Sequence, residues 1–368
     1  MQLQSQKNAG AKERKCVWAF KPWKVLIFAL FIASFLTGCR ESSSSIRNET
    51  LRIDTPAGMI DYLQRAQLPA LKSVEVWQNQ YAPGLKLTTA HYEIFTTLLE
   101  PLMLSQVPGF VESAYQGYNS QLPQPVETTA RFRIYLFAQR QQWEDFTQTF
   151  AGPQAPIFCK IKAGAYYLND ACVAYNIGRE RTFSAIGHEG WHQFNKRLFQ
   201  FRLPSWLDEG IAMLFEVGRY DQGLFYFQPQ RNMYRLGELK TILMKNKMLP
   251  LKELIAINPG EVLTSEKEDA VMAFYGQSYA LVRFLREEGY GKRLRSFQSL
   301  LLGGLRGNWP LSDVDKRIAA DRNIQLTVRW NRAAGTELFK HYIGDDFDQL
   351  EQEYLAFCRK MVYHVHFK

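Results

Sequence analysis

Apolar and polar residues alternate at several places in the first half of this chain, and the alternation predicts β-strands. It is clearest at residues 131–137, where a half-buried strand is expected to lead into a helix that begins at Gln139. Residues 164–168 and 171–175 are separated by a two-residue Asn-Asp turn, which is typical of a β-hairpin. A further strand is expected within residues 88–97. The first half of the chain is therefore predicted to form a small sheet.

Apolar residues recur at helical spacing through most of the remaining sequence. Between residues 181 and 199 they define one long amphipathic helix, which Thr182 or Ser184 is expected to cap. The other expected helices lie at 48–84, with breaks at Pro69 and Pro83, and at 98–118, 231–247, 251–257, 269–288, 292–305 and 345–362. A small sheet, one long helix and then a helical lobe predict an α+β fold with a cleft between sheet and lobe.

The long helix carries the first of two motifs that indicate metal chemistry. Residues 188–192 read His-Glu-Gly-Trp-His, so His188 and His192 are spaced i and i+4 and lie on one helix face. Two imidazoles in this arrangement can bind one Zn²⁺. Glu189, on the same turn, is placed to act as a base on a metal-bound water. The alternative interpretation is a pair of ordinary core histidines.

The second motif, Trp-Leu-Asp-Glu-Gly at residues 206–210, supplies a third ligand. Ser205 is expected to cap a helix here, with Asp208 as its capping-box partner, and this places Glu209 in the first turns, facing the first motif. Two His and one Glu leave one position on zinc open, as a catalytic site requires, so one Zn²⁺ per chain is predicted. Asp208 and Glu216 are candidates for orienting the ligand histidines.

Together the two motifs resemble those of the gluzincin metallopeptidases, most closely the peptidase MA-like branch. The resemblance covers about residues 85–368 and implies a zincin-like fold. In that fold a small sheet with the active-site helix, at 85–200, is followed by a helical lobe at 201–368. The resemblance also implies the zinc ligands and the general base already named from the motifs. Residues 48–84 would then be a separate N-terminal helical segment.

The resemblance adds two expectations about catalysis. Residues 275–285 are similar to a helix of the larger gluzincins whose tyrosine stabilises the oxyanion, which would make Tyr275 catalytic; Ser278 replaces the usual glycine of that helix. Packing of the Tyr275 ring in the core is the alternative. In gluzincins the strand before the zinc helix is a sheet edge that adds the substrate as a further strand, and residues 163–168 match it here.

Residues 1–38 have the pattern of a bacterial secretion signal. A basic stretch precedes an apolar run at residues 25–35, which is too short to span a membrane. Leu-Thr-Gly-Cys at 36–39 resembles a lipobox, so Cys39 is expected to be lipidated, with residues 39–47 as its flexible tether. This implies a lipid-anchored protein on the periplasmic side of the cell envelope, at the outer membrane in a Gram-negative host. An ordinary cleaved signal with a free cysteine is the alternative.

The net charge of the chain bears on its binding partners, and its cysteines bear on whether it contains a disulfide. The net charge of +9 falls to +4 without the six basic residues and one acidic residue of positions 1–38, which is too mild to predict nucleic-acid binding. Cys159 and Cys172 flank the predicted hairpin and are favoured as a disulfide, with Cys358 as a lone core thiol. Three free thiols are the alternative.

The function predicted from these features is zinc-dependent hydrolysis of peptide bonds in the bacterial cell envelope. An endopeptidase is favoured because the Gly-x-Met-Glu-Asn stretch with which aminopeptidase-like gluzincins anchor a free amino terminus is absent. The expected partners are a peptide or protein substrate and the membrane, through the lipid on Cys39. Two alternatives stay open: a catalytically silent scaffold or binding lipoprotein with the zincin fold, and an amidase that acts on peptidoglycan stem peptides.

Overall fold

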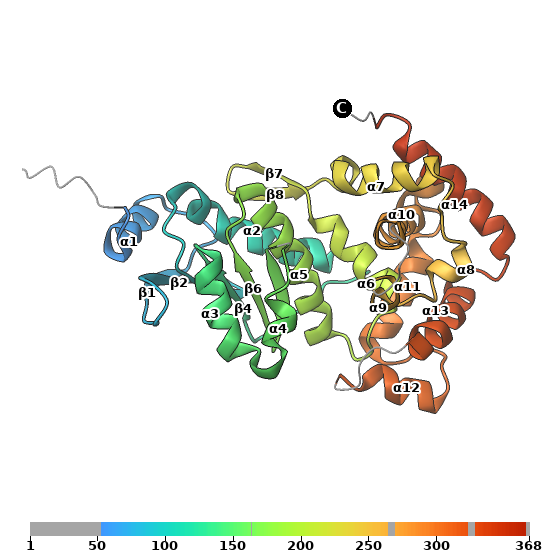
Figure 1. Ribbon diagram of the computed structural model, residues 1–368, viewed down its shortest axis with the longest axis horizontal. Helices are drawn as coiled ribbons and strands as arrows, with labels where there is room; N and C mark the ends of the chain where they lie inside the picture. The colour runs from blue at the N-terminus through green and yellow to red at the C-terminus, as the bar shows by residue number, and fades with distance from the viewer. Residues whose placement is uncertain (1–52, 163, 264–268, 323–327, 366–368) are drawn as a thin grey trace, which may run out of the picture. The chain divides into compact units, whose positions relative to one another are not determined.

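Figure 1 shows the computed structural model, which describes residues 53–162, 164–263, 269–322 and 328–365. The predicted signal peptide at 1–38, the tether at 39–47 and the lipidation site Cys39 lie outside these residues. Within the described ranges, no helix combines the length and the apolar character that crossing a membrane requires.

A six-stranded mixed sheet dominates the first half of the described chain. Its strands follow the spatial order β1 (Ser73–Trp77), β2 (Gly84–Thr88), β3 (Tyr92–Thr96), β4 (Phe132–Phe137), β6 (Ala171–Tyr175) and β5 (Ala165–Leu168). β4 pairs in parallel with β3 and with β6, whereas the other neighbours are antiparallel. The predicted strand at 131–137 and the predicted hairpin are therefore confirmed, and β5 is an edge of the sheet.

The segment before this sheet differs from the prediction. The sequence predicts helix over 48–84, but in the described part of that range the α-helix is limited to α1 (Pro56–Arg65), and β1 joins the sheet. The Ser-Val-Glu-Val-Trp sequence of β1 alternates and contains β-branched residues, which favour a strand. Glu75 also forms a cross-strand ion pair of 3.4 Å with Lys86 on β2. Residues 48–84 are therefore not a separate helical segment.

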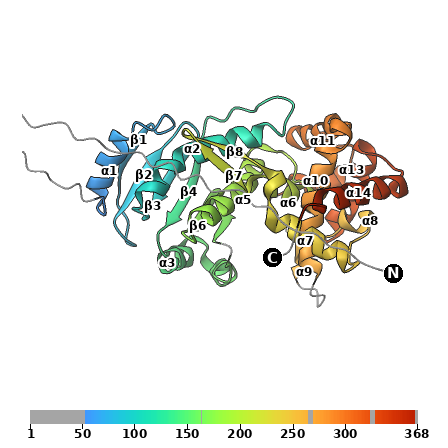
Figure 2. The ribbon, with the colours of Figure 1, turned by 90° about the horizontal axis from the view of Figure 1, so that it is seen from above.

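Helices cover both faces of the sheet, and alternation along the strands separates two cores (Figures 1 and 2). On one face, Ile134, Leu136 and Cys172 belong to the core that includes α2 (Pro101–Asn119) and α5 (Arg179–Leu198). On the other face, Phe137 and Val173 pack with α3 (Arg140–Phe150). The sheet therefore holds α5, the helix of the first motif, against one of its faces.

The predicted disulfide between Cys159 and Cys172 is absent, and both residues are free thiols, as is Cys358. Cys172 points into the core shared with α5, whereas Cys159 follows α4 (Ala155–Phe158) on the α3 side, where Gln148 contacts its sulfur. Alternation along β6 directs the Cys172 side chain away from the face that α3 covers. Burial raises the pKa of the Cys172 thiol well above its ordinary value, so this thiol stays protonated.

The second half of the described chain is mainly helical. Its helices are α6 (Ser205–Ala212), α7 (Met233–Met244), α8 (Leu251–Leu254), α9 (Pro259–Leu263), α10 (Ala270–Gly291), α11 (Leu294–Arg306), α12 (Asp313–Ala320), α13 (Val328–Tyr342) and α14 (Phe347–Val362). The five helices predicted after residue 231 are confirmed as α7, α8, α10, α11 and α14. Three further helices and a hairpin of β7 (Gly218–Asp221) and β8 (Leu224–Phe227) were not predicted. The fold is mixed α+β, as predicted.

The starts of the two motif helices differ from the prediction. α5 has Gly178 at its N-cap and is not capped by Thr182 or Ser184; the Thr182 hydroxyl accepts a hydrogen bond from the loop before the helix. α6 has Pro204 at its N-cap, and the Ser205 hydroxyl bonds to a side chain of α13. α6 contacts both α5 and α10, so it links the sheet to the helical part (Figure 2).

Candidate metal centre

Three side chains from α5 and α6 converge as the two motifs predict. The Nε2 atoms of His188 and His192 lie 3.3 and 3.8 Å from the Oε2 atom of Glu209. One ligand atom from each residue lies within 4.8 Å of the other two. Because zinc bonds to nitrogen and oxygen ligands are about 2 Å long, a single ion fits between atoms at this separation. The group could therefore hold a metal ion.

Glycines in both motifs let the motif helices pack closely against α2 and α10. Gly210 on α6 faces α10, and a Cβ there would lie 2.5 Å from Val282 and 2.6 Å from the carbonyl oxygen of Ser278. Gly190, inside the first motif, faces α2, and a Cβ there would collide with the Tyr118 hydroxyl. A larger residue at either position would push a motif helix away from its neighbour, so these glycines serve packing rather than chemistry.

A buried network of charges holds His188 from behind. The Nδ1 atom of His188 lies 3.0 Å from Glu216, so Glu216, which was predicted as an orienting residue, contacts one of the two histidines. Glu216 in turn accepts hydrogen bonds from Arg235, at 2.7 and 3.0 Å, and from the Asn232 side chain at 2.7 Å. Arg235 also forms an ion pair of 3.0 Å with Glu238. Glu216 is therefore fixed by two residues of the α7 region before it contacts the histidine.

One carboxylate surrounded by neutral donors holds His192. The Oδ1 atom of Asp208 lies 3.0 Å from Nδ1 of His192 and accepts hydrogen bonds from Trp191 at 2.9 Å and from Asn195 at 2.6 Å. The predicted capping role of Asp208 is therefore wrong, because its side chain turns toward α5. Its contact with His192 is the one that the predicted orienting role requires.

The carboxylates around the two histidines favour positive charge at this point. Burial alone would lower the pKa of His188, but its hydrogen bonds to Glu209 and Glu216 outweigh burial and raise it to about 10. At His192, Asp208 and Glu209 also outweigh burial, and the pKa rises to about 9. Surroundings that stabilise protons on both rings also stabilise a divalent cation bound to the deprotonated rings.

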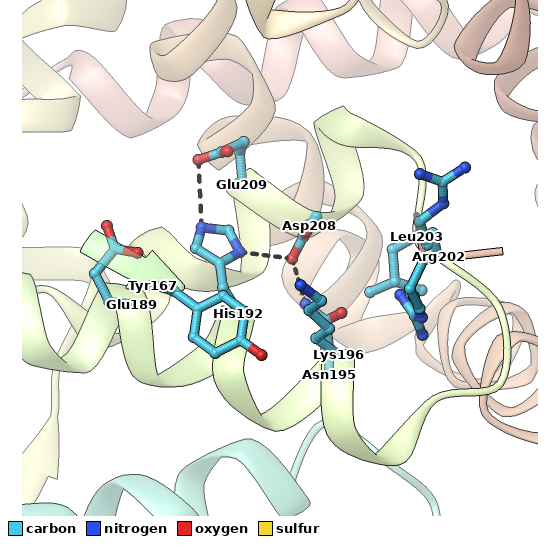
Figure 3. A pocket seen from close by; sticks show the side chains of 10 residues that line it. Tyr167, Glu189, His192, Asn195, Lys196, Arg202, Leu203, Asp208 and Glu209 are labelled. Carbon is cyan, nitrogen blue, oxygen red and sulfur yellow. Dashed lines mark hydrogen bonds and ion pairs between the residues drawn. The ribbon is translucent and has the colours of Figure 1, made fainter. Parts of the chain in front are cut away.

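Glu189 lies in a pocket of about 440 Å³ beside the ligand group (Figure 3). His192 and Glu209 line the same pocket. Burial raises the pKa of the Glu189 carboxyl, and the nearby histidines oppose the rise. Among the described residues this carboxylate has no hydrogen-bond partner, in contrast to the other three acids of the site. Glu189 can therefore accept a proton from a molecule in the pocket.

Tyr275 reaches the same group from α10. Its ring centre lies 5.4 Å from the Arg235 guanidinium. The negative charge of Glu209 and then burial raise the pKa of Tyr275, and the charge of Glu189 adds to the rise. The ring also packs against the large hydrophobic core, as the alternative interpretation expects, so packing and a role beside the carboxylates are both compatible with its position. Its phenol stays protonated and can donate a hydrogen bond.

Sequence analysis did not find the residues that complete the site. Arg235 and Glu238 are spaced i and i+3, which indicates a shared helix face, but this spacing gives no sign that Glu216 lies opposite. Lys196 follows His192 by four residues, so its position on the same face of α5 could have been recognised. The contacts of α7 with Glu216 depend on tertiary packing that no local pattern reports.

A comparison of the chain with models of known protein families finds no match. A comparison with curated proteins likewise finds no relative.

Proposed function

We propose that this chain is a zinc-dependent peptidase with a zincin-like fold. The observation that carries the proposal is that each histidine presents its Nε2 atom to Glu209 while Glu216 or Asp208 holds its Nδ1 atom. Partners of this kind fix the ring orientation and the tautomer in which Nε2 can bind a metal. Two imidazoles and one carboxylate favour zinc over calcium or magnesium, which prefer oxygen ligands.

A catalytic site is favoured over a purely structural one for two reasons. Three protein ligands leave one zinc position open, whereas structural zinc sites are closed by four. Two of the ligands, His192 and Glu209, also line the pocket that contains Glu189, so a substrate in the pocket would reach them. Glu189 has no hydrogen-bond partner among the described residues and lies next to these ligands, so its carboxylate is available for proton transfer.

The residues of the site have separate tasks in this proposal. A bound zinc ion would polarise the carbonyl of the scissile bond and lower the pKa of a nearby water. Glu189 takes the proton of the attacking water and passes it to the leaving amine, and its raised pKa suits both transfers. The protonated phenol of Tyr275 donates a hydrogen bond to the carbonyl oxygen as negative charge develops there.

The position of β5 supports an extended peptide as the substrate. β5 pairs only with β6 in the described sheet, so its other side offers backbone groups to a further strand. Tyr167 on β5 lines the pocket together with Glu189, which places the added strand beside the site. An endopeptidase fits this arrangement. We further propose that a lipid on Cys39 holds the protein at the periplasmic face of the envelope, because residues 36–39 resemble a lipobox.

A Glu189→Gln substitution tests the proposal. We expect the variant to keep about one zinc per chain and to lose peptide hydrolysis by roughly 10²-fold or more, because only the proton acceptor is removed. Elemental analysis gives the zinc content, and mass spectrometry of a digested peptide library gives the rate. Glu180→Gln, at an exposed position in the first turn of the same helix, is the matched control and should behave like the unchanged protein.

Three results would contradict parts of the proposal. Full turnover by the Glu189→Gln variant would remove the general-base role. A folded protein that binds no zinc would remove the metal centre itself. Zinc binding without cleavage of any peptide would favour the silent scaffold, and cleavage limited to peptidoglycan stem peptides would favour the amidase.

A further inference from the structure

The pocket beside the candidate metal centre has a basic end. Besides the residues of the site, its lining includes Lys196, Arg202 and Arg322. In Figure 3, Glu189 and Arg202 lie at opposite ends of the row of side chains, with His192 between them. One end of the pocket is therefore acidic around the ligand group, and the other end carries cations that the proposed hydrolysis does not use.

Each of these three cations contacts a neutral group. The ammonium of Lys196 lies 5.1 Å from the ring centre of Tyr167, and Arg322 donates a hydrogen bond to the backbone carbonyl of Phe199. Arg202 donates to the carbonyl of Ile318 at 2.9 Å. Across the described residues, no carboxylate forms an ion pair with Lys196 or Arg322. Both cations are therefore positioned without being neutralised at contact distance.

The cations also act on one another. Burial lowers the pKa of Lys196, and the charges of Arg322 and Arg202 lower it further, while Asp170 opposes them. Burial and then Arg202 lower the pKa of Arg322, while Asp208 opposes them. Asp208 already accepts three hydrogen bonds behind His192. An anion that entered this end of the pocket would relieve the repulsion.

We propose that Lys196, Arg202 and Arg322 form a subsite for a carboxylate group of the peptide substrate. The proposal deepens the peptidase function above and rests on it. A peptide supplies a carboxylate either at its C-terminus or on an Asp or Glu side chain. Both present two oxygens to guanidinium and ammonium donors, which bind carboxylates with strong, charge-assisted hydrogen bonds. Substrates with a carboxylate at the right distance from the scissile bond are therefore selected over neutral ones.

Binding of labelled peptides to the zinc-loaded Glu189→Gln chain tests this subsite without requiring turnover. Three kinds of fluorescent peptide share one sequence: an amidated neutral peptide, the same peptide with a free C-terminal carboxylate, and amidated peptides with one Glu at each position in turn. We expect one carboxylate-bearing kind to bind about tenfold more tightly than the neutral peptide by fluorescence anisotropy. Whether the free terminus or the internal Glu gives the gain identifies the source of the carboxylate.

Substitutions in the same background assign the preference to the cations. Lys196→Met combined with Arg322→Met leaves Arg202 as the one cation of the proposed subsite, and should bring the Kd of the carboxylate peptides to within about twofold of that of the neutral peptide. The Kd of the neutral peptide itself should change less than twofold. Lys160→Met combined with Arg295→Met removes the same charge at exposed positions and should keep the preference. If the first double variant does not unfold cooperatively, Lys196→Met alone should lower the preference about threefold.

Each outcome bears on the proposal. Equal Kd values for neutral and carboxylate peptides, or a preference that survives loss of Lys196 and Arg322, would overturn it. A preference that the double variant abolishes supports the subsite. If the unchanged chain cleaves no peptide but shows this preference, the peptidase function fails while the carboxylate subsite stands.

Discussion

The two histidines of the candidate metal centre lie one turn apart on α5, yet the protein holds them in different ways. His188 rests on Glu216, which is fixed by the Arg235 guanidinium and by Asn232. His192 rests on Asp208, whose other partners are the neutral donors Trp191 and Asn195. The first support comes from the chain around α7, whereas the second is built from the motif helices. The two histidines therefore present the same ring atom to Glu209 but are held by different kinds of interaction, one with a charged residue behind it and one with neutral donors.

The two supports also differ in exposure. The Glu216 side chain is 9% exposed, whereas that of Asp208 is 24% exposed and lines the pocket. Charge buried to the extent of Glu216 requires a paired countercharge, and Arg235 supplies it. The pKa of Glu216 falls to about 2 because its hydrogen bonds from His188 and Arg235 outweigh burial. Glu216 and Arg235 should therefore contribute more to the stability of the fold, whereas Asp208 should contribute more to the binding of molecules in the pocket.

The largest effect should follow from breaking the charged support. We expect Arg235→Met to lower the free energy of unfolding by roughly 3 kcal/mol, because it leaves Glu238 without its cation and Glu216 with His188 as its remaining charged partner. Urea denaturation of the chelator-treated protein measures the loss without a contribution from bound metal. Arg295→Met, at an exposed position on α11, is the control and should change stability by less than about 0.5 kcal/mol. A loss below about 1 kcal/mol for Arg235→Met would show that water replaces the guanidinium. The charged interactions behind His188 would then stabilise the fold no more than the neutral ones behind His192.

Zinc affinity provides the second test of the comparison. Removing a residue that orients a metal ligand commonly weakens binding about 10- to 100-fold, so Glu216→Ala and Asp208→Ala should both raise the zinc Kd within that range. We expect Glu216→Ala to have the larger effect, because it also frees Arg235 to repel an incoming cation. Competition with a chromophoric chelator measures both values. A larger effect of Asp208→Ala would reverse the assignment of the stronger support to His188.

The sequence was sufficient to predict that His188, His192 and Glu209 come together, because this grouping follows from local spacing. The i and i+4 positions of His188 and His192 place them on one face of a helix, and the second motif places Glu209 opposite them. The strand at 131–137 and the hairpin were predicted from alternation, which is also a local property. Asp208 and Glu216 were identified as orienting candidates, although which of them supports which histidine required the structure.

The predictions that failed depend on contacts between distant segments. Asp208 has a suitable position for a capping box, but a histidine, a tryptophan and an asparagine of α5 bind its carboxylate instead. Cys159 and Cys172 are close in sequence, yet they lie on opposite sides of the sheet, which only the packing of α3 and α5 establishes. The basic end of the pocket joins α5 to Arg322, which lies far away in the chain. No spacing rule relates such residues.

The smallest effect should come from a neutral donor on the His192 side. Asn195→Ala removes a hydrogen bond of 2.6 Å to Asp208, which costs about 1.5–3 kcal/mol for a bond to a charged group. Alanine recovers about 0.5 kcal/mol through its higher helix propensity, so the free energy of unfolding should fall by roughly 1–2.5 kcal/mol. The zinc Kd should rise less than tenfold, because Trp191 still holds the carboxylate that orients His192. Urea denaturation and chelator competition on the same sample test both numbers. A zinc Kd that rises as much as in Asp208→Ala would show that Asn195 is essential to the orientation of His192. Asp208 would then depend on its neutral donor as strongly as Glu216 depends on Arg235.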